Sequence, residues 1–210
     1  DFLTAFSALS STSNLKSTVA QPLDIVLVLD ASGSMDDPMG NSDSTKRIDA
    51  LKAAANSFID EIAKQNASIS DPAQQHQVSL VKFAGKKNNQ VGNDTYRDGG
   101  YTYNYSQVMK NLTSCVGSSA DDLKSTVNAI KPAGATQADY GLQLAADQAS
   151  GREDAKKIVV FFTDGSPTSS NGFKDGVAGD AIAAAKSMKD AGATIYSVGI
   201  FSGANPSADP

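Results

Sequence analysis

The sequence has little cysteine, no long apolar run and no basic cluster, and each of these absences argues against one class of protein. Cys115 is the only cysteine among 210 residues, so no internal disulfide can form and the core or a bound ion must hold the fold. No apolar stretch approaches the roughly 20 residues that a membrane helix needs, so we expect no membrane insertion. The 18 basic residues are spread along a chain of net charge −5, which argues against nucleic acid as a partner.

The two rarest reactive side chains occur in ordinary surroundings. Cys115 follows the run "NLTS", which has a weak strand pattern, and we expect a buried, inert thiol, because a reactive one needs neighbours that stabilise the thiolate. His76 is the only histidine. It stands in a polar connection, where we expect it to be solvated.

Apolar runs alternate with helical patterns along the chain. The run "DIVLVLD" is short, β-branched and apolar on both alternations, as is typical of a central parallel strand covered by helices on both faces. Further strands are predicted at 77–84, 106–113, 156–164 and 193–200. Helices are predicted at 46–65, 119–130, 136–150 and 178–192, the first capped by Ser44 or Thr45. This alternation predicts an α/β fold, a doubly wound and mostly parallel sheet flanked by helices.

Two segments lie outside this pattern. Residues 1–22 mix small polar and apolar residues without a sustained period, so we expect an irregular N-terminal lead-in before one domain over 23–210. The segment 85–105 is long for a bare connection and rich in Asn, Gly and Tyr. Two interpretations are equally favoured: a binding surface, or a hairpin whose tyrosines cover the core.

Oxygen-bearing side chains follow the two most apolar strands. Asp30 and Asp164 each end such a strand, Ser32 and Ser34 follow the first, and Thr136 lies in the loop "GATQ". Loops after parallel strands converge at the carboxyl edge of the sheet, where ligands gather. Carboxylate and hydroxyl oxygens without His or Cys select a hard cation rather than zinc. The sequence therefore predicts a divalent-cation site at this edge.

Three motifs together resemble the von Willebrand factor A domain. "DASGS" matches the D-x-S-x-S motif of that family, "GAT" its second loop and "FFTDG" its third, in the family's order, over about residues 24–200. The resemblance implies a metal-ion-dependent adhesion site formed by Asp30, Ser32, Ser34, Thr136 and Asp164. In that family the hydroxyls often touch the ion directly, while one or both aspartates act through water.

The resemblance also implies a function. A cation held mostly by neutral oxygens keeps charge to attract an anionic ligand, so the expected partner is a protein offering an Asp or Glu carboxylate, such as host extracellular matrix or a cell surface. Mg²⁺ is the ion we expect, with Mn²⁺ and Ca²⁺ as alternatives. The family usually continues with another strand and a closing helix, which leaves open whether residues 23–210 lack that pair.

The acidic pair Asp36 and Asp37 follows the first motif closely. Integrin β subunits, which are relatives of this domain, carry an acidic pair just after the same "SM" for an adjacent regulatory cation. Here the pair sits one position earlier and Pro38 follows it. We favour a solvated acidic loop, with a second cation at Asp36 and Asp37 as the alternative.

Several functional classes compete at this stage. The chain is most similar to surface or pilus-tip adhesins of Gram-positive bacteria, which implies an extracellular location at the cell wall or pilus tip. The alternatives are a cytosolic scaffold subunit of the same family and, less favoured, a metal-dependent phosphohydrolase. Phosphatases of the haloacid-dehalogenase type need an Asp where Ser32 stands, and a serine hydrolase needs G-x-S-x-G with a histidine base. We therefore expect a binding module and not an enzyme.

Overall fold

The chain folds around one central five-stranded sheet. The computed structural model describes residues 21–40, 43–88, 94–149, 151–165, 168–169 and 172–200. The strand order in the sheet is β11-β8-β1-β4-β7, and only β7 runs antiparallel to its neighbour. The strands are β1 (Leu23–Asp30), β4 (Gln77–Phe83), β7 (Gln107–Ser114), β8 (Lys156–Thr163) and β11 (Thr194–Gly199). The predicted α/β fold with a mostly parallel sheet is confirmed.

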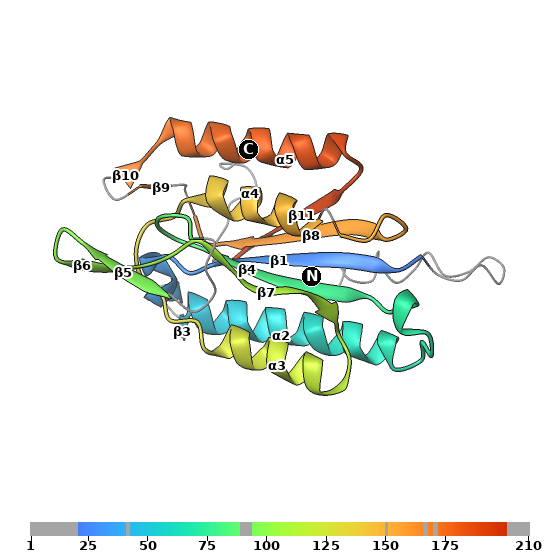
Figure 1. The fold of residues 1–210 in the computed structure, drawn as a ribbon. Helices are drawn as coiled ribbons and strands as arrows, with labels where there is room; N and C mark the ends of the chain where they lie inside the picture. The colour runs from blue at the N-terminus through green and yellow to red at the C-terminus, as the bar shows by residue number, and fades with distance from the viewer. Residues whose placement is uncertain are drawn as a thin grey trace.

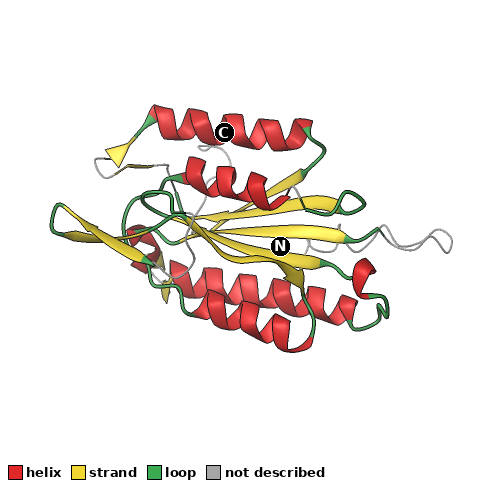
Figure 2. Ribbon diagram, in the orientation of Figure 1, coloured by secondary structure: helices red, strands yellow, loops and turns green. Residues whose placement is uncertain are grey.

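Helices cover both faces of the sheet. Helices α2 and α3 lie on one face and α4 and α5 on the other (Figure 1; Figure 2 shows the three layers by element type). Their bounds are α2 (Arg47–Asn66), α3 (Gly117–Asn128), α4 (Ala138–Ala149) and α5 (Asp175–Asp190). Within the described residues, no helix has the length and apolar character needed to span a membrane.

Strand β1 shows why the central position could be read from the sequence. Ile25, Leu27 and Leu29 belong to the core cluster under α2 and α3, while Val26 and Val28 belong to the cluster under α4 and α5. Alternate side chains of a strand point to opposite faces, so a strand buried on both faces must be apolar at every position. All five side chains are fully buried.

Short elements lie at the carboxyl edge of the sheet. They are the 3₁₀ turn η1 (Gly33–Asp36) and the strand pairs β2 (Pro38–Gly40) with β3 (Asp43–Lys46), β5 (Thr95–Asp98) with β6 (Tyr101–Asn104), and β9 (Thr168–Ser169) with β10 (Gly172–Phe173). The β5–β6 hairpin extends beyond this edge (Figure 1). It accounts for most of the described part of the predicted insertion. Tyr96 stacks on Tyr103 and contacts the Tyr105 ring at a tilt, and none of the three belongs to either core cluster. The tyrosines therefore do not cover the core.

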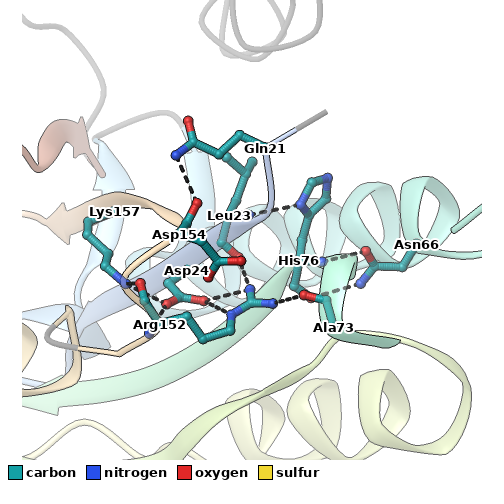
Figure 3. A network of polar contacts seen from close by, with 9 residues as sticks. All are labelled: Gln21, Leu23, Asp24, Asn66, Ala73, His76, Arg152, Asp154 and Lys157. Carbon is teal, nitrogen blue, oxygen red and sulfur yellow. Dashed lines mark hydrogen bonds and ion pairs between the residues drawn. The ribbon is translucent and has the colours of Figure 1, made fainter. Parts of the chain in front are cut away.

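A buried ionic network ties together the opposite edge, where β1 and β8 begin (Figure 3). The Asp24 carboxylate is fully buried and accepts hydrogen bonds from the Arg152 guanidinium at 2.7 and 3.0 Å and from Lys157 Nζ at 2.7 Å. Arg152 also donates to the carbonyl of Ala73, in the 3₁₀ turn η2 (Pro72–Gln74), at 2.7 Å. Three segments far apart in the sequence are thereby joined through Asp24 and Arg152.

His76 belongs to this edge, and the expectation that it is solvated was wrong. Its side chain is 7% exposed, and Nδ1 accepts a hydrogen bond from the Leu23 amide at 3.1 Å. The amide group of Asn66 holds the His76 backbone from both sides, donating to its carbonyl and accepting from its N–H, each at 2.8 Å. Asn66 also donates to the carbonyl of Cys115, whose thiol is buried as predicted, and burial raises the pKa of that thiol to about 12.

The protonation of His76 should make folding stability depend on pH. Burial, with a smaller effect of the Arg152 charge, lowers the pKa of His76 below its ordinary 6.5. The unfolded chain therefore takes up a proton at a higher pH than the folded chain, so the free energy of unfolding should fall as the pH drops below 6.5. Urea unfolding between pH 5 and 8 measures this fall. The variant His76→Asn keeps an acceptor but cannot titrate, and a fall of equal size in both proteins would contradict the assignment.

Candidate metal centre

The candidate site lies where β1 and β8, which are paired in parallel, both end. Asp30 is the last residue of β1, and Asp164 directly follows β8. After Asp30 the chain leaves the sheet into η1, whose Met35 is fully buried in the core beneath α2. This apolar anchor holds the loop that carries Ser32 and Ser34 against the end of the sheet.

Asp30 is a buried carboxylate with no cation partner among the described residues. Its side chain is fully buried; Oδ1 accepts from the Ser32 amide at 2.9 Å and Oδ2 from the Thr163 hydroxyl at 3.0 Å. Burial raises the pKa of Asp30 to about 6, with a smaller contribution from the Asp164 charge, although the hydrogen bonds from Ser32 and Thr163 act in the opposite direction. None of the ion pairs within the described ranges involves this carboxylate. Buried charges in proteins are normally paired or bound to a metal.

A chain of polar contacts links the two serines to Asp164. The hydroxyl oxygens of Ser32 and Ser34 lie 3.1 Å apart, and Ser34 Oγ donates to Asp164 Oδ1 at 3.1 Å. The other oxygen of Asp164, Oδ2, accepts from Arg47 Nη1 at 2.8 Å. Four of the five residues predicted from the sequence are thus brought together, since Ser32 also binds Asp30 through its amide.

Backbone hydrogen bonds place the loop of Thr136 next to the loop that carries Ser32 and Ser34. It is buried, and its N–H and C=O pair with those of Thr168 at 3.0 Å each. The carbonyl of Gly134, two residues earlier, accepts from the Gly33 amide at 2.9 Å, which places the two loops against each other. No hydrogen bond joins the Thr136 side chain to the other four residues in the described part of the chain, so its role as a ligand stays a prediction.

Gly134 also shows how closely the β5–β6 hairpin packs on these loops. Its φ is +105°, and an added Cβ would lie 2.7 Å from the ring of Tyr103 in β6. Asn104, which directly follows Tyr103 in β6, also supports the site and was not predicted from the sequence. The buried Asn104 amide donates to the carbonyls of Ala31 at 2.9 Å and Lys131 at 2.7 Å. The hairpin is therefore hydrogen-bonded to both loops of the candidate site.

The oxygen spacing fits a divalent cation with octahedral geometry. At a metal–oxygen distance of about 2.1 Å, neighbouring corners of an octahedron lie about 3.0 Å apart. The contacts from Ser34 Oγ to Ser32 Oγ and to Asp164 Oδ1 are both 3.1 Å. All of these candidate ligand atoms are hard oxygens, which suit Mg²⁺, Mn²⁺ or Ca²⁺. The residues present therefore fit such an ion.

The acidic pair predicted as an alternative second site lies on the exposed side of the same loop. Asp36 forms an ion pair with Lys46 at 2.8 Å, and both side chains are at least half exposed. The backbone carbonyl of Asp37 accepts from the amide of Arg47 at 2.9 Å. No group of three or more acidic, His or Cys side chains suited to a metal occurs within the described residues. A second cation at Asp36 and Asp37 stays a prediction.

Comparison with known proteins identifies a family and similar folds. The model of the von Willebrand factor type A domain matches residues 24–209. The pilus adhesin SpaC from Lactobacillus rhamnosus GG aligns with a TM-score of 0.61 and 21% identity, over 88% of this chain and 25% of SpaC.

Two other solved structures show the same fold. A D319A mutant of the PilB minor pilin from Streptococcus sanguinis has a TM-score of 0.50, 18% identity and coverage of 73% of this chain and 32% of PilB. Proximal thread matrix protein 1 from the mussel byssus has a TM-score of 0.54 and 18% identity, over 85% of this chain and 38% of that protein. The chain thus spans between a quarter and two fifths of these structures. A comparison with curated protein sequences gives no match.

Proposed function

The chain belongs to the von Willebrand factor type A family, and we propose that it is a divalent-cation-dependent adhesion module that captures a carboxylate of a partner protein. The proposal rests on one observation: Asp30 is fully buried without a cation partner among the described residues, beside hydroxyl and carboxylate oxygens spaced for an octahedral ion. Asp30, Ser32, Ser34, Thr136 and Asp164 would hold the ion. Mg²⁺ is the ion that we favour, with Mn²⁺ and Ca²⁺ as alternatives.

Each residue contributes differently to such a site. A bound cation would supply positive charge and one exchangeable coordination position for the incoming carboxylate. The serine hydroxyls provide neutral ligands, and the two carboxylates compensate only part of the charge. Asp30 is fixed by hydrogen bonds to both of its oxygens, so little ordering remains to be done when the ion enters.

A place on the cell surface or on a pilus is part of this proposal. The fold is shared with the pilus adhesin SpaC and the minor pilin PilB, which supports a role in adhesion of the Gram-positive type. A binding role rather than catalysis is supported by the position of His76, the only histidine in the chain. It precedes β4 at the edge of the sheet opposite Asp30, and so cannot act as a base at the candidate site.

Thermal unfolding of the whole chain tests the cation site directly. In chelator followed by Mg²⁺, Mn²⁺ or Ca²⁺ at about 100 times the dissociation constant, binding should stabilise the folded state by about 3 kcal/mol. For a chain of this size, that corresponds to a rise in melting temperature of about 5–10 °C. Na⁺ at matched ionic strength is the control. A melting temperature that is the same with chelator and with all three cations would contradict the proposal.

A further inference from the structure

Arg47 is a basic residue at the N-terminus of a helix, where the helix dipole disfavours positive charge. It is the first residue of α2, directly after Lys46, which serves as the N-cap without a side-chain cap. The predicted caps Ser44 and Thr45 were wrong, because α2 begins at Arg47 and its N-cap is Lys46, after both residues. A helix N-terminus carries partial positive charge and favours acidic residues. A basic residue at this position is therefore unfavourable for the helix itself, and only Asp49 in the first turn has the sign of charge that the dipole favours.

The guanidinium of Arg47 points at the candidate metal centre. Nη1 donates to Asp164 Oδ2 at 2.8 Å, and the Asp164 side chain is only 2% exposed while that of Arg47 is 25% exposed. Nε of Arg47 is buried without a hydrogen-bond partner in the described structure. The side chain is thus held in place by Asp164 even though one of its own donors stays unsatisfied.

The two oxygens of Asp164 have separate partners. Oδ2 is taken by Arg47, while Oδ1 faces the hydroxyl of Ser34 on the side where the cation would lie. Arg47 therefore leaves the site-facing oxygen free for the ion. The charged groups in this arrangement are Asp30, Asp164 and Arg47, which together carry one negative charge.

We propose that Arg47 sets the net charge of the cation-loaded site at plus one and thereby makes it an acceptor for a single carboxylate. This inference rests on the proposed function. A divalent ion added to two carboxylates alone gives a neutral site, and a neutral site attracts an anion only through coordination. With the guanidinium present, one positive charge remains uncompensated in a half-buried setting, where Coulomb attraction is less screened than in water. The same guanidinium repels the cation, so the chain gains carboxylate affinity at the expense of cation affinity.

Replacing Arg47 with Gln separates these two effects. R47Q removes the charge and keeps a polar amide, but its side chain is two bonds shorter than that of Arg and loses the contact of Nη1 with Asp164, so R47K serves as the control for that contact. We would titrate the full chain with Mn²⁺, followed by electron paramagnetic resonance, and then add glutarate as the carboxylate probe. Displacement of metal-bound water by glutarate is followed through the relaxation rate of water protons. In R47Q we expect Mn²⁺ to bind several-fold more tightly and glutarate about tenfold more weakly than in the wild type.

Two further variants make the test specific. R47K keeps the charge and should bind glutarate within about twofold of the wild type. K46Q removes the neighbouring charge, which is paired with the exposed Asp36, and should change neither affinity. If R47Q fails to fold, an R47K variant that loses glutarate affinity while keeping Mn²⁺ affinity overturns the charge argument, and one that keeps both supports it.

The outcomes distinguish this inference from the proposed function. A wild-type chain that binds no Mn²⁺, or binds it without capturing glutarate, removes the proposed function and this inference with it. A wild type that does both, alongside an R47Q variant with unchanged glutarate affinity, overturns only the role of Arg47. Weaker binding of both Mn²⁺ and glutarate in R47Q would also overturn it, because that pattern reports only on the position of Asp164.

Discussion

Asp30→Asn is expected to stabilise the cation-free chain and at the same time to abolish its response to divalent cations. Burial raises the pKa of Asp30 from 3.8 to about 6, so keeping this carboxylate charged at pH 7 costs about 3 kcal/mol of folding free energy. Asn has the same shape without the charge. It can accept from the Ser32 amide, and the Thr163 hydroxyl can rotate to accept from its NH₂ group. The melting temperature in chelator should therefore rise by several degrees.

The pH dependence of this gain follows from the sign of the pKa shift. The folded pKa of Asp30 is higher than the ordinary value, so the folded wild type binds more protons than the unfolded chain between about pH 4 and pH 6. The wild type loses stability as the pH rises through that window. The advantage of Asp30→Asn should accordingly be absent below about pH 4, grow up to about pH 6 and stay constant above it.

Asp164→Asn is the matched control, because Asp164 already has a positively charged side chain, Arg47, as its partner. Its ion pair with Arg47 at 2.8 Å would be lost, so this variant should be less stable than the wild type in chelator. Both variants should lose the rise in melting temperature with Mg²⁺. Thermal unfolding of the three proteins, with and without cation, gives all of these values. An Asp30→Asn protein that melts below the wild type in chelator, or that still responds to Mg²⁺, would disprove the assignment of Asp30.

Much of the fold and the candidate site could be predicted because their signals are local. Strand β1 is apolar on both alternations because both of its faces are buried, and a pattern of this kind is visible in seven consecutive letters. Asp30 and Asp164 end parallel neighbours, and the topology alone brings such residues to one edge. Residues at the ends of these two strands, which the motifs mark in the sequence, therefore lie close together in the structure.

The residues that support the site gave weaker signals. Asn104 contacts Ala31 across 73 positions of the chain, and no local pattern marks it. His76 stands among polar neighbours in the sequence, yet the start of β1 and the end of α2 cover it. Arg47 did leave a trace, since a basic residue at a helix N-terminus conflicts with the helix dipole. Such local conflicts are where function is expected to override helix stability.

Arg152→Met is expected to cause the largest loss of stability, about 3–5 kcal/mol in the free energy of unfolding. Asp24 is fully buried, and Arg152 supplies two guanidinium hydrogen bonds and one backbone hydrogen bond to it. Removing one partner of a buried ion pair leaves an incompletely compensated charge in the interior, which is why the cost is high. Met preserves most of the side-chain length. Urea unfolding of both proteins measures the difference.

Arg97→Met is the surface control for this variant. Arg97 lies in the exposed strand β5 and donates only to the carbonyl of Gly100 at 3.2 Å among its described hydrogen bonds. Its removal should change stability by less than about 0.5 kcal/mol. Equal effects of the two substitutions would show that Asp24 does not need its guanidinium partner.

A double variant separates the ion pair from the packing of the Arg152 side chain. If the cost of Arg152→Met comes from the uncompensated Asp24 carboxylate, combining it with Asp24→Asn should recover part of the lost stability, so the two effects will not add. Asp24 and Asp30 are six residues apart along β1, a separation of about 20 Å at strand geometry. The destabilised Arg152→Met chain should therefore keep its full stabilisation by Mg²⁺ at temperatures where it is folded. Loss of that response would mean that the network around Asp24 also determines the geometry of the opposite edge.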